Sequence, residues 1–105
     1  MASKSTLQAR ADVFKALGHP TRLAIVDMLA AGERCVCDLN EEIDADISTV
    51  SRHLAVLRNV GILSSEKRGN QVFYKLQCPC IMTFYGCVES VITGGPAPIM
   101  LEAHK

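Results

Sequence analysis

The spacing of the apolar residues changes at Gly61, and this change limits the folds that the chain can adopt. Before Gly61, apolar side chains recur at the three- and four-residue intervals of helices. After it, residues 62–68 and 71–76 are typical of two strands joined by a tight turn at Gly69-Asn70. Helical spacing then returns and continues to Ile92. The chain is therefore expected to be mainly helical, with one β-hairpin before its last helix.

Glycine and proline mark the ends of the first two helices. Residues 7–17 have helical spacing, and Gly18 is expected to end this helix in a left-handed conformation. Pro20 is expected to open the second helix, where its missing N–H costs nothing, and Gly32 to end it. The side chains of the second helix that are expected to be buried are Leu23, Val26, Leu29 and Ala30.

The next two helices form a predicted helix-turn-helix. Asp38 and Glu41 fit a capping box for a short helix over residues 39–43. Ser48 is expected to cap a longer helix over residues 49–59, and residues 44–46 join the two tightly. A β-hairpin that follows a helix-turn-helix is a wing. The predicted fold is therefore a winged helix-turn-helix, mainly α with a β-hairpin wing, in the order α-α-α-α-β-β-α.

The last helix is expected to begin at Pro79, with Cys78 as its cap, and to break at residues 94–98. We expect residues 1–93 to form a single DNA-binding domain and residues 94–105 to form a mobile tail. One face of this helix carries its apolar side chains, which are Ile81, Phe84, Tyr85, Val88 and Ile92.

The composition indicates a globular protein of the cytoplasm. Hydrophobic residues make up 49% of the 105 residues, which excludes general disorder. No run approaches the roughly 20 apolar residues of a membrane span. Residues 1–6 are polar and lack the apolar core of a signal peptide, so no membrane partner is expected. In a reducing compartment, five cysteines favour metal or redox chemistry over a disulfide framework.

The net charge is zero, but the charges are unevenly distributed. Residues 31–50 contain six acidic side chains and one basic side chain, whereas residues 51–80 contain five basic side chains and one acidic side chain. A neutral chain with a basic segment can still present a phosphate-binding face. Double-stranded DNA is therefore an expected partner, bound with a steep dependence on salt.

The helix over residues 49–59 has the side chains that a DNA-reading helix needs. Val50, Leu54 and Leu57 recur on the inward face, while Arg52 on the other face can bond bidentately to guanine. The alternative is a solvated helix face, with His53 as a hydrogen-bonded structural residue. The residues expected to contact DNA are Ser48, Thr49, Ser51, Arg52, His53 and Arg58 on this helix, and Lys67 and Arg68 on the wing.

Four segments together resemble the ArsR/SmtB family of winged-helix metal-responsive repressors, of the type that controls arsenical resistance. They are LGHPTRL (residues 17–23), GERCVCDL (32–39), VSRHLAVLR (50–58) and QVFYKL (71–76), and the resemblance covers residues 7–92. It implies a homodimer joined through its first and last helices and bound to an imperfect palindromic operator. It also implies that an inducer ion relieves repression of a resistance or efflux operon.

Cys35 and Cys37 are the first candidates for the metal ligands. In an extended segment such a pair points to one side, whereas in a regular helix the two side chains would diverge by about 200°. Chelation by both therefore requires a non-helical or distorted backbone. Thiolates bind soft ions, so arsenite or antimonite is the favoured inducer, followed by cadmium, lead or zinc.

The resemblance also shows where this chain departs from the arsenic-sensing pattern. That pattern has a third cysteine at the position of Asn40, which is a poor ligand for trivalent arsenic, and leucine at the position of Arg34. Cys78 and Cys80 could complete the site or form a second one. Cys87 is a further candidate, although it would lie about 10 Å from Cys80 along a straight helix. Each thiol could instead be a packed, unreactive side chain.

Two other functions fit the same thiols. A thiol-redox or persulfide-sensing repressor would use a cysteine pair without a stoichiometric metal. A structural zinc protein would lose its fold on chelation, because the metal contributes folding free energy. The sequence contains no Cys-x-x-Cys, phosphate loop or catalytic constellation, so an enzyme is not expected.

Overall fold

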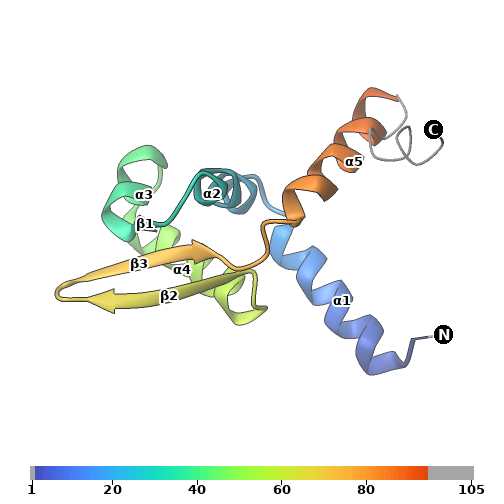
Figure 1. The fold of residues 1–105 in the computed structure, drawn as a ribbon, viewed down its shortest axis with the longest axis horizontal. Helices are drawn as coiled ribbons and strands as arrows, with labels where there is room; N and C mark the ends of the chain where they lie inside the picture. The colour runs from blue at the N-terminus through green and yellow to red at the C-terminus, as the bar shows by residue number, and fades with distance from the viewer. Residues whose placement is uncertain (1, 95–105) are drawn as a thin grey trace.

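The computed structural model describes residues 2–94 of the chain. It confirms the winged helix-turn-helix fold and adds one short strand that the sequence did not predict, β1 (Figure 1). The elements are α1 (Lys4–Leu17), α2 (Pro20–Ala30), β1 (Arg34–Cys35), α3 (Val36–Glu42), α4 (Ile47–Asn59), β2 (Leu63–Arg68), β3 (Gln71–Leu76) and α5 (Ile81–Thr93).

The junction of α1 and α2 differs from the prediction in two details. Gly18 has a φ of −81°, so α1 does not end in a left-handed residue, and the next residue, His19, is extended with a φ of −150° and a ψ of 132°. Its Nδ1 accepts a hydrogen bond from the backbone N–H of Thr21 at 3.1 Å, which caps α2. Pro20 opens α2 as predicted. Leu23 and Ala30 are exposed rather than buried, which corrects the prediction for these two side chains.

Both helices of the helix-turn-helix begin earlier than predicted. Cys35 is the N-cap of α3, with extended φ and ψ of −80° and 159°, so Asp38 lies within the first turn and is not the cap. Asp46, and not Ser48, caps α4. Its Oδ1 accepts hydrogen bonds from the Thr49 N–H at 2.9 Å and from the Ser48 hydroxyl at 3.2 Å. The reading helix therefore begins at Ile47.

The three strands form one antiparallel sheet in the order β1-β3-β2. The hairpin pairs Leu63 with Leu76 at its base and Arg68 with Gln71 at its tip. β1 joins the opposite edge of β3, where Cys35 is the partner of Phe73. The wing is therefore connected through backbone pairing to the residue that starts α3.

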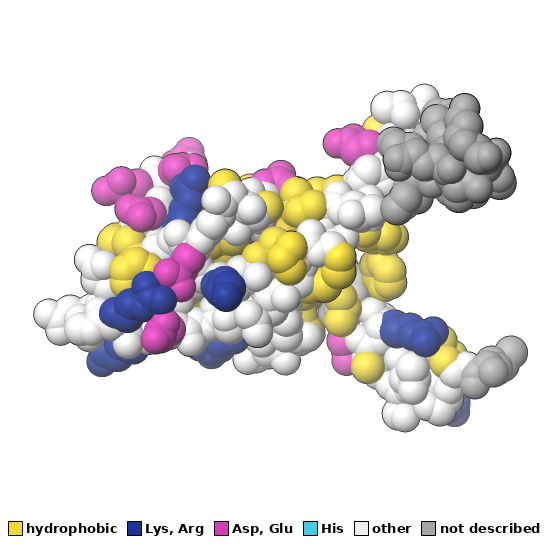
Figure 2. Space-filling model, viewed as in Figure 1, with side chains coloured by type: hydrophobic (Ala, Val, Ile, Leu, Met, Phe, Trp, Pro, Cys, Tyr) yellow, Lys and Arg dark blue, Asp and Glu magenta, His cyan; other side chains and the backbone are white. Residues whose placement is uncertain are grey.

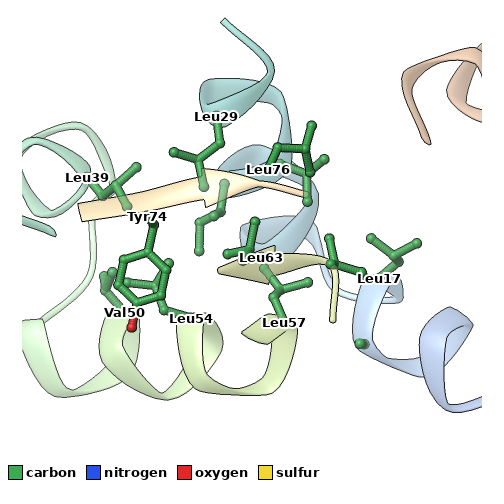
Figure 3. Packing of buried hydrophobic residues seen from close by; sticks show 13 residues of the cluster. Leu17, Leu29, Leu39, Val50, Leu54, Leu57, Leu63, Tyr74 and Leu76 are labelled. Carbon is green, nitrogen blue, oxygen red and sulfur yellow. The ribbon is translucent and has the colours of Figure 1, made fainter. Parts of the chain in front are cut away.

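The core lies between α2, α4 and the sheet (Figure 3). The predicted inward residues of α4 are all buried there, at no more than 1% exposed. Leu39 of α3 enters the same cluster, so α3 and α4 share one packed interior. The two helices are therefore in contact through close-packed side chains.

Helices α1 and α5 project from this body as two arms (Figure 1). Helix α5 begins at Ile81, later than predicted, because Pro79 and Cys80 form a turn before it, and it ends at Gly94, which is left-handed with a φ of 78°. No residue of α5 is buried. Between residues 2 and 94, none of the helices combines the length and apolarity that crossing a bilayer requires. The predicted tail lies, apart from Gly94, outside the described residues.

Candidate metal centre and nucleic-acid interface

The structure brings Cys35 and Cys37 together at the start of α3. Their two Sγ atoms and a carboxylate oxygen of Asp38 all lie within 4.8 Å of one another. This proximity results from the backbone, which is extended at Cys35 and helical from Val36 onward. The predicted requirement for a non-helical residue in the pair is thus met. Cys35 is buried and Cys37 is exposed, so the pair has one closed side and one side open to solvent.

The pKa of the exposed thiol, Cys37, is raised above its ordinary value. The hydrogen bond with Cys35 raises the pKa of Cys37, and burial and the nearby charges of Cys35 and Asp38 raise it further. Two adjacent thiolates and a carboxylate would repel one another, so this cluster favours a cation that replaces the protons. The donor set fits a soft or borderline metal ion.

Asn40 lies beside this pair, at the position where the arsenic-sensing pattern has a cysteine. Its side-chain Oδ1 is buried and, among the described residues, has no hydrogen-bond partner. Asn40 and Cys37 line one open cavity of about 410 Å³ between α3, α4 and the wing. The isolation of this oxygen could not be foreseen from the sequence, since it depends on residues from three elements.

Cys78 and Cys80 form a second pair, separate from the first. Their Sγ atoms lie 2.7 Å apart and both side chains are exposed. The hydrogen bond between the two thiols is the main cause that raises the pKa of Cys80. Within residues 2–94, these thiols do not join the cluster of Cys35 and Cys37. Cys35 pairs with the middle of β3, whereas Cys78 follows the far end of that strand.

Cys87 lies in the middle of α5 and is half-buried. It takes no part in the contact between Cys78 and Cys80. The structure thus assembles two cysteine pairs, each from neighbouring residues, and leaves the fifth cysteine apart from both.

The outward face of α4 presents the predicted DNA-reading side chains. Those that are exposed are Ser48, Ser51, Arg52 and Arg58, while Thr49 and His53 are half-buried. Arg58 lies in the last turn and Arg52 near the middle of the helix. The face therefore combines hydroxyl groups at the entry with two cations further along, as direct readout and phosphate contact require.

His53 has the structural contacts that the sequence left open as its alternative role. Its Nδ1 accepts a hydrogen bond from Nε of Arg22 at 3.0 Å, and its ring centroid lies 4.4 Å from that of His19. Burial is the main cause that lowers the pKa of His53, followed by the charges of His19, Arg22 and Arg52. Through these contacts His53 connects α4 to the junction of α1 and α2.

On the wing, Lys67 and Arg68 are both exposed, and Arg68 is bound to carboxylates of the protein itself. Its guanidinium donates to both carboxylate oxygens of Glu33 at 2.8 Å each and to Glu66 at 2.6 Å. It also lies 4.6 Å above the ring centre of Phe73. The Arg68 guanidinium lowers the pKa of Glu33. Glu33, which the sequence did not single out, thus links the wing to the segment just before Cys35.

A large apolar surface lies where the two arms leave the body (Figure 2). The rings of Phe14 and Phe84 contact each other edge to face, with centroids 5.6 Å apart. Both side chains line a cavity of about 390 Å³. The exposed apolar side chains of α1, α2 and α5 that line it are Phe14, Leu23, Phe84, Val88 and Ile92.

Comparison with known proteins supports the interpretation of the chain as a DNA-binding regulator. Residues 19–65 match the family model described as "Bacterial regulatory protein, arsR family". The chain is 43% identical over 65 residues to an uncharacterised HTH-type transcriptional regulator of Methanocaldococcus jannaschii, covering 61% of this chain and 73% of that protein. It is 48% identical over 65 residues to the arsenical resistance operon repressor of Escherichia coli K12, covering 61% of this chain but only 56% of that repressor.

A solved structure extends the likeness over most of the chain. The homodimeric winged helix-turn-helix DNA-binding domain from Mycobacterium bovis, a possible ArsR-family regulator, superposes with a TM-score of 0.74 at 27% identity and covers 88% of both chains. These relatives are regulators of transcription and not enzymes, which confirms the expectation from the sequence. The chain belongs to the ArsR family of bacterial regulatory proteins.

Proposed function

We propose that this protein is a metal-responsive repressor that releases its DNA operator when a thiophilic ion binds Cys35 and Cys37. The observation that carries the proposal is the cluster of two Sγ atoms and one carboxylate within 4.8 Å, directly at the start of the helix-turn-helix. The cluster needs no rearrangement of other elements to offer its ligands. Such a placement joins ion binding to DNA reading within one short segment.

The coupling of ion binding to DNA release would follow from the positions of the two cysteines on different elements. Cys35 belongs to β1 and is paired with β3, whereas Cys37 belongs to the first turn of α3. An ion bound by both thiolates would fix the start of α3 relative to the sheet. Leu39 would transmit this change to Val50 and Leu54, because all three share the core. The orientation of α4, and with it the position of its exposed arginines, would then differ between the free and the ion-bound protein.

The ion is expected to be one that prefers sulfur. Arsenite and antimonite are candidates, supported by the name of the Escherichia coli relative, and cadmium, lead and zinc share the affinity for thiolates. The regulated genes would then form a resistance or efflux operon.

Operator binding is proposed to require a homodimer on an imperfect palindrome. The apolar surface between α1 and α5 supports this, since it leaves large side chains exposed on one protomer. A second copy of the chain that covers this surface would place two reading helices on one face of the DNA.

The test measures release of DNA by reduced protein. Operator DNA is first selected by the protein from a random pool, and the complex is then titrated with each of the five ions. We expect at least one ion to dissociate wild-type protein, and Cys35→Ser and Cys37→Ser to remain bound. Cys87→Ser is the matched control and should respond as wild type does. If no ion dissociates the complex, the proposal fails.

A second candidate function, redox sensing, rests on the 2.7 Å contact between Sγ of Cys78 and Sγ of Cys80. Hydrogen peroxide would take two electrons and two protons from these thiols, leaving one disulfide and two molecules of water. Treatment with peroxide should then release the DNA in wild type but not in Cys78→Ser. Retention of DNA by oxidised wild-type protein would exclude this candidate.

A further inference from the structure

The orphaned amide oxygen of Asn40 is an unexplained polar group beside the dithiol. A buried carbonyl-type oxygen is normally paired, because leaving it without a donor costs free energy. In this protein Oδ1 of Asn40 is buried and, among residues 2–94, accepts no hydrogen bond. Such an oxygen can accept a proton donor or coordinate a cation. Its isolation therefore requires an explanation from the surroundings.

Those surroundings are the thiol site. Cys37 and Asn40 are three residues apart on α3, so their side chains lie on neighbouring positions of one helix face. Both line the same open cavity, which gives them a common approach from solvent. Cys37 in turn shares the 4.8 Å cluster with Cys35 and Asp38. The two thiols, the Asp38 carboxylate and the Asn40 amide thus all belong to one short segment, residues 35–40.

From this arrangement we infer that Asn40 Oδ1 and the Asp38 carboxylate complete the dithiol as a mixed sulfur and oxygen site for a borderline divalent cation, with zinc or cadmium bound more tightly than arsenite. This inference rests on the proposed function, because it concerns the same site at Cys35 and Cys37. It adds the class of ion that this site prefers.

The chemistry of the donors distinguishes these ions. Zinc accepts four ligands in a tetrahedron and tolerates mixtures of thiolate and carboxylate or carbonyl oxygen. Cadmium is also divalent, is softer than zinc and shares its affinity for thiolates, so the same four donors suit both ions. Trivalent arsenic bonds to thiolates, and this cluster offers only two of them. A divalent ion would also be attracted by the Asp38 carboxylate, whereas arsenite in water is a neutral molecule.

The test measures binding of ions to the reduced full chain without DNA. All variants carry Cys78→Ser and Cys80→Ser, so that the second thiol pair cannot contribute. Zinc and cadmium affinities are obtained by competition with a chromophoric chelator, and arsenite affinity by calorimetry. ¹¹³Cd NMR then reports whether the bound cadmium has two sulfur ligands together with oxygen ligands.

We expect cadmium and zinc to bind more tightly than arsenite, and Asn40→Ala to weaken both divalent ions by about 10–100-fold, as loss of a supporting group does at other metal sites. Asn40→Cys should reverse the order by adding a third thiolate. Asn70→Ala, which alters another amide of the same cavity, is the control and should change neither affinity. Without metal, the midpoint temperature of thermal unfolding should be the same in Asn40→Ala as in the parent protein, because no hydrogen bond of Oδ1 is lost.

Three results would overturn the inference: arsenite binding more tightly than cadmium and zinc, unchanged divalent affinity in Asn40→Ala, or a ¹¹³Cd signal without oxygen ligands. None of these would affect the proposed function if an ion still releases DNA through Cys35 and Cys37. Conversely, tight oxygen-assisted cadmium binding without any release of DNA would contradict the proposed function and leave this inference intact.

Discussion

At the scale of single residues, the side chains of α4 divide into those that fix the helix and those that are free to read DNA. His53 belongs to the first group, because Arg22 donates to its Nδ1 and the ring contacts His19. Arg52 belongs to the second, because it is exposed on the outward face. The two adjacent residues therefore have different consequences when they are changed.

The lowered pKa of His53 predicts a specific dependence of stability on pH. A histidine with a lower pKa in the folded protein binds fewer protons when folded. Its contribution is complete above the unfolded value of about 6.5 and is lost as the pH falls through the folded pKa. Urea unfolding between about pH 5 and pH 8 should thus show a steeper loss of stability in wild type than in His53→Asn. Parallel curves for the two proteins would contradict this.

Arg52→Ala should weaken binding to the selected operator by about 1–3 kcal/mol, the value of one bidentate contact with a base. It should also reduce the preference for that operator over random DNA. Arg58→Ala is the comparison, since a phosphate contact should weaken both DNAs equally. Fluorescence anisotropy with both DNAs measures the two effects. If Arg52→Ala lowered the affinity for the operator and for random DNA equally, Arg52 would contact phosphate and not a base.

At the scale of elements, the wing and the start of α3 are joined by both backbone and side chains. β1 pairs with β3, and Arg68 of β2 binds Glu33, which precedes β1. In the free protein, two carboxylates therefore compete with DNA phosphate for the Arg68 guanidinium. If the wing binds DNA through Arg68, as we propose, the guanidinium must exchange at least one of these carboxylates for a phosphate.

Glu33→Gln should consequently raise affinity for DNA. If Arg68 then neutralises one more phosphate, the slope of log affinity against log salt should become steeper by about 0.9. Glu42→Gln is the matched control, because Glu42 pairs with Arg34 at 2.6 Å and not with the wing. An unchanged slope in Glu33→Gln would show that Arg68 does not contact phosphate.

Elements that bury a regular face were predicted well from the sequence, and those defined by distant contacts were not. The inward residues of α4 and the hairpin register follow from apolar spacing and from the turn at Gly69. β1 has only two residues, so it has no period and exists through its pairing with β3. That pairing keeps Cys35 extended and makes it the cap of α3, which a local capping pattern at Asp38 could not reveal.

The candidate site was predicted in part for the same reason. The two cysteine pairs, Cys35 with Cys37 and Cys78 with Cys80, are each close in the chain and could be inferred, although the extended backbone at Cys35 comes from its pairing with β3. The burial of Asn40 Oδ1 and the pairing of Glu33 with Arg68 depend on side chains from separate elements. Neither leaves a signal in the spacing of residues.

At the scale of the whole molecule, the two arms carry the apolar surface proposed to join two copies of the chain. Val88→Asp places a charge on this surface and should shift the protein from dimer to monomer. Thr83→Asp is the control on the same helix, since Thr83 is exposed and does not line the surface. Light scattering coupled to size exclusion measures the mass. A dimeric Val88→Asp protein would place the interface elsewhere.

We propose that ion binding at Cys35 and Cys37 and DNA binding oppose each other. By thermodynamic linkage, the factor by which the ion weakens DNA binding must equal the factor by which DNA weakens ion binding. The most direct test measures the affinity of the inducing ion for the free protein and for the protein saturated with operator DNA. We predict weaker ion binding on DNA by that same factor, and no difference in the residual binding of Cys35→Ser. Equal ion affinity with and without DNA in wild type would contradict the claim.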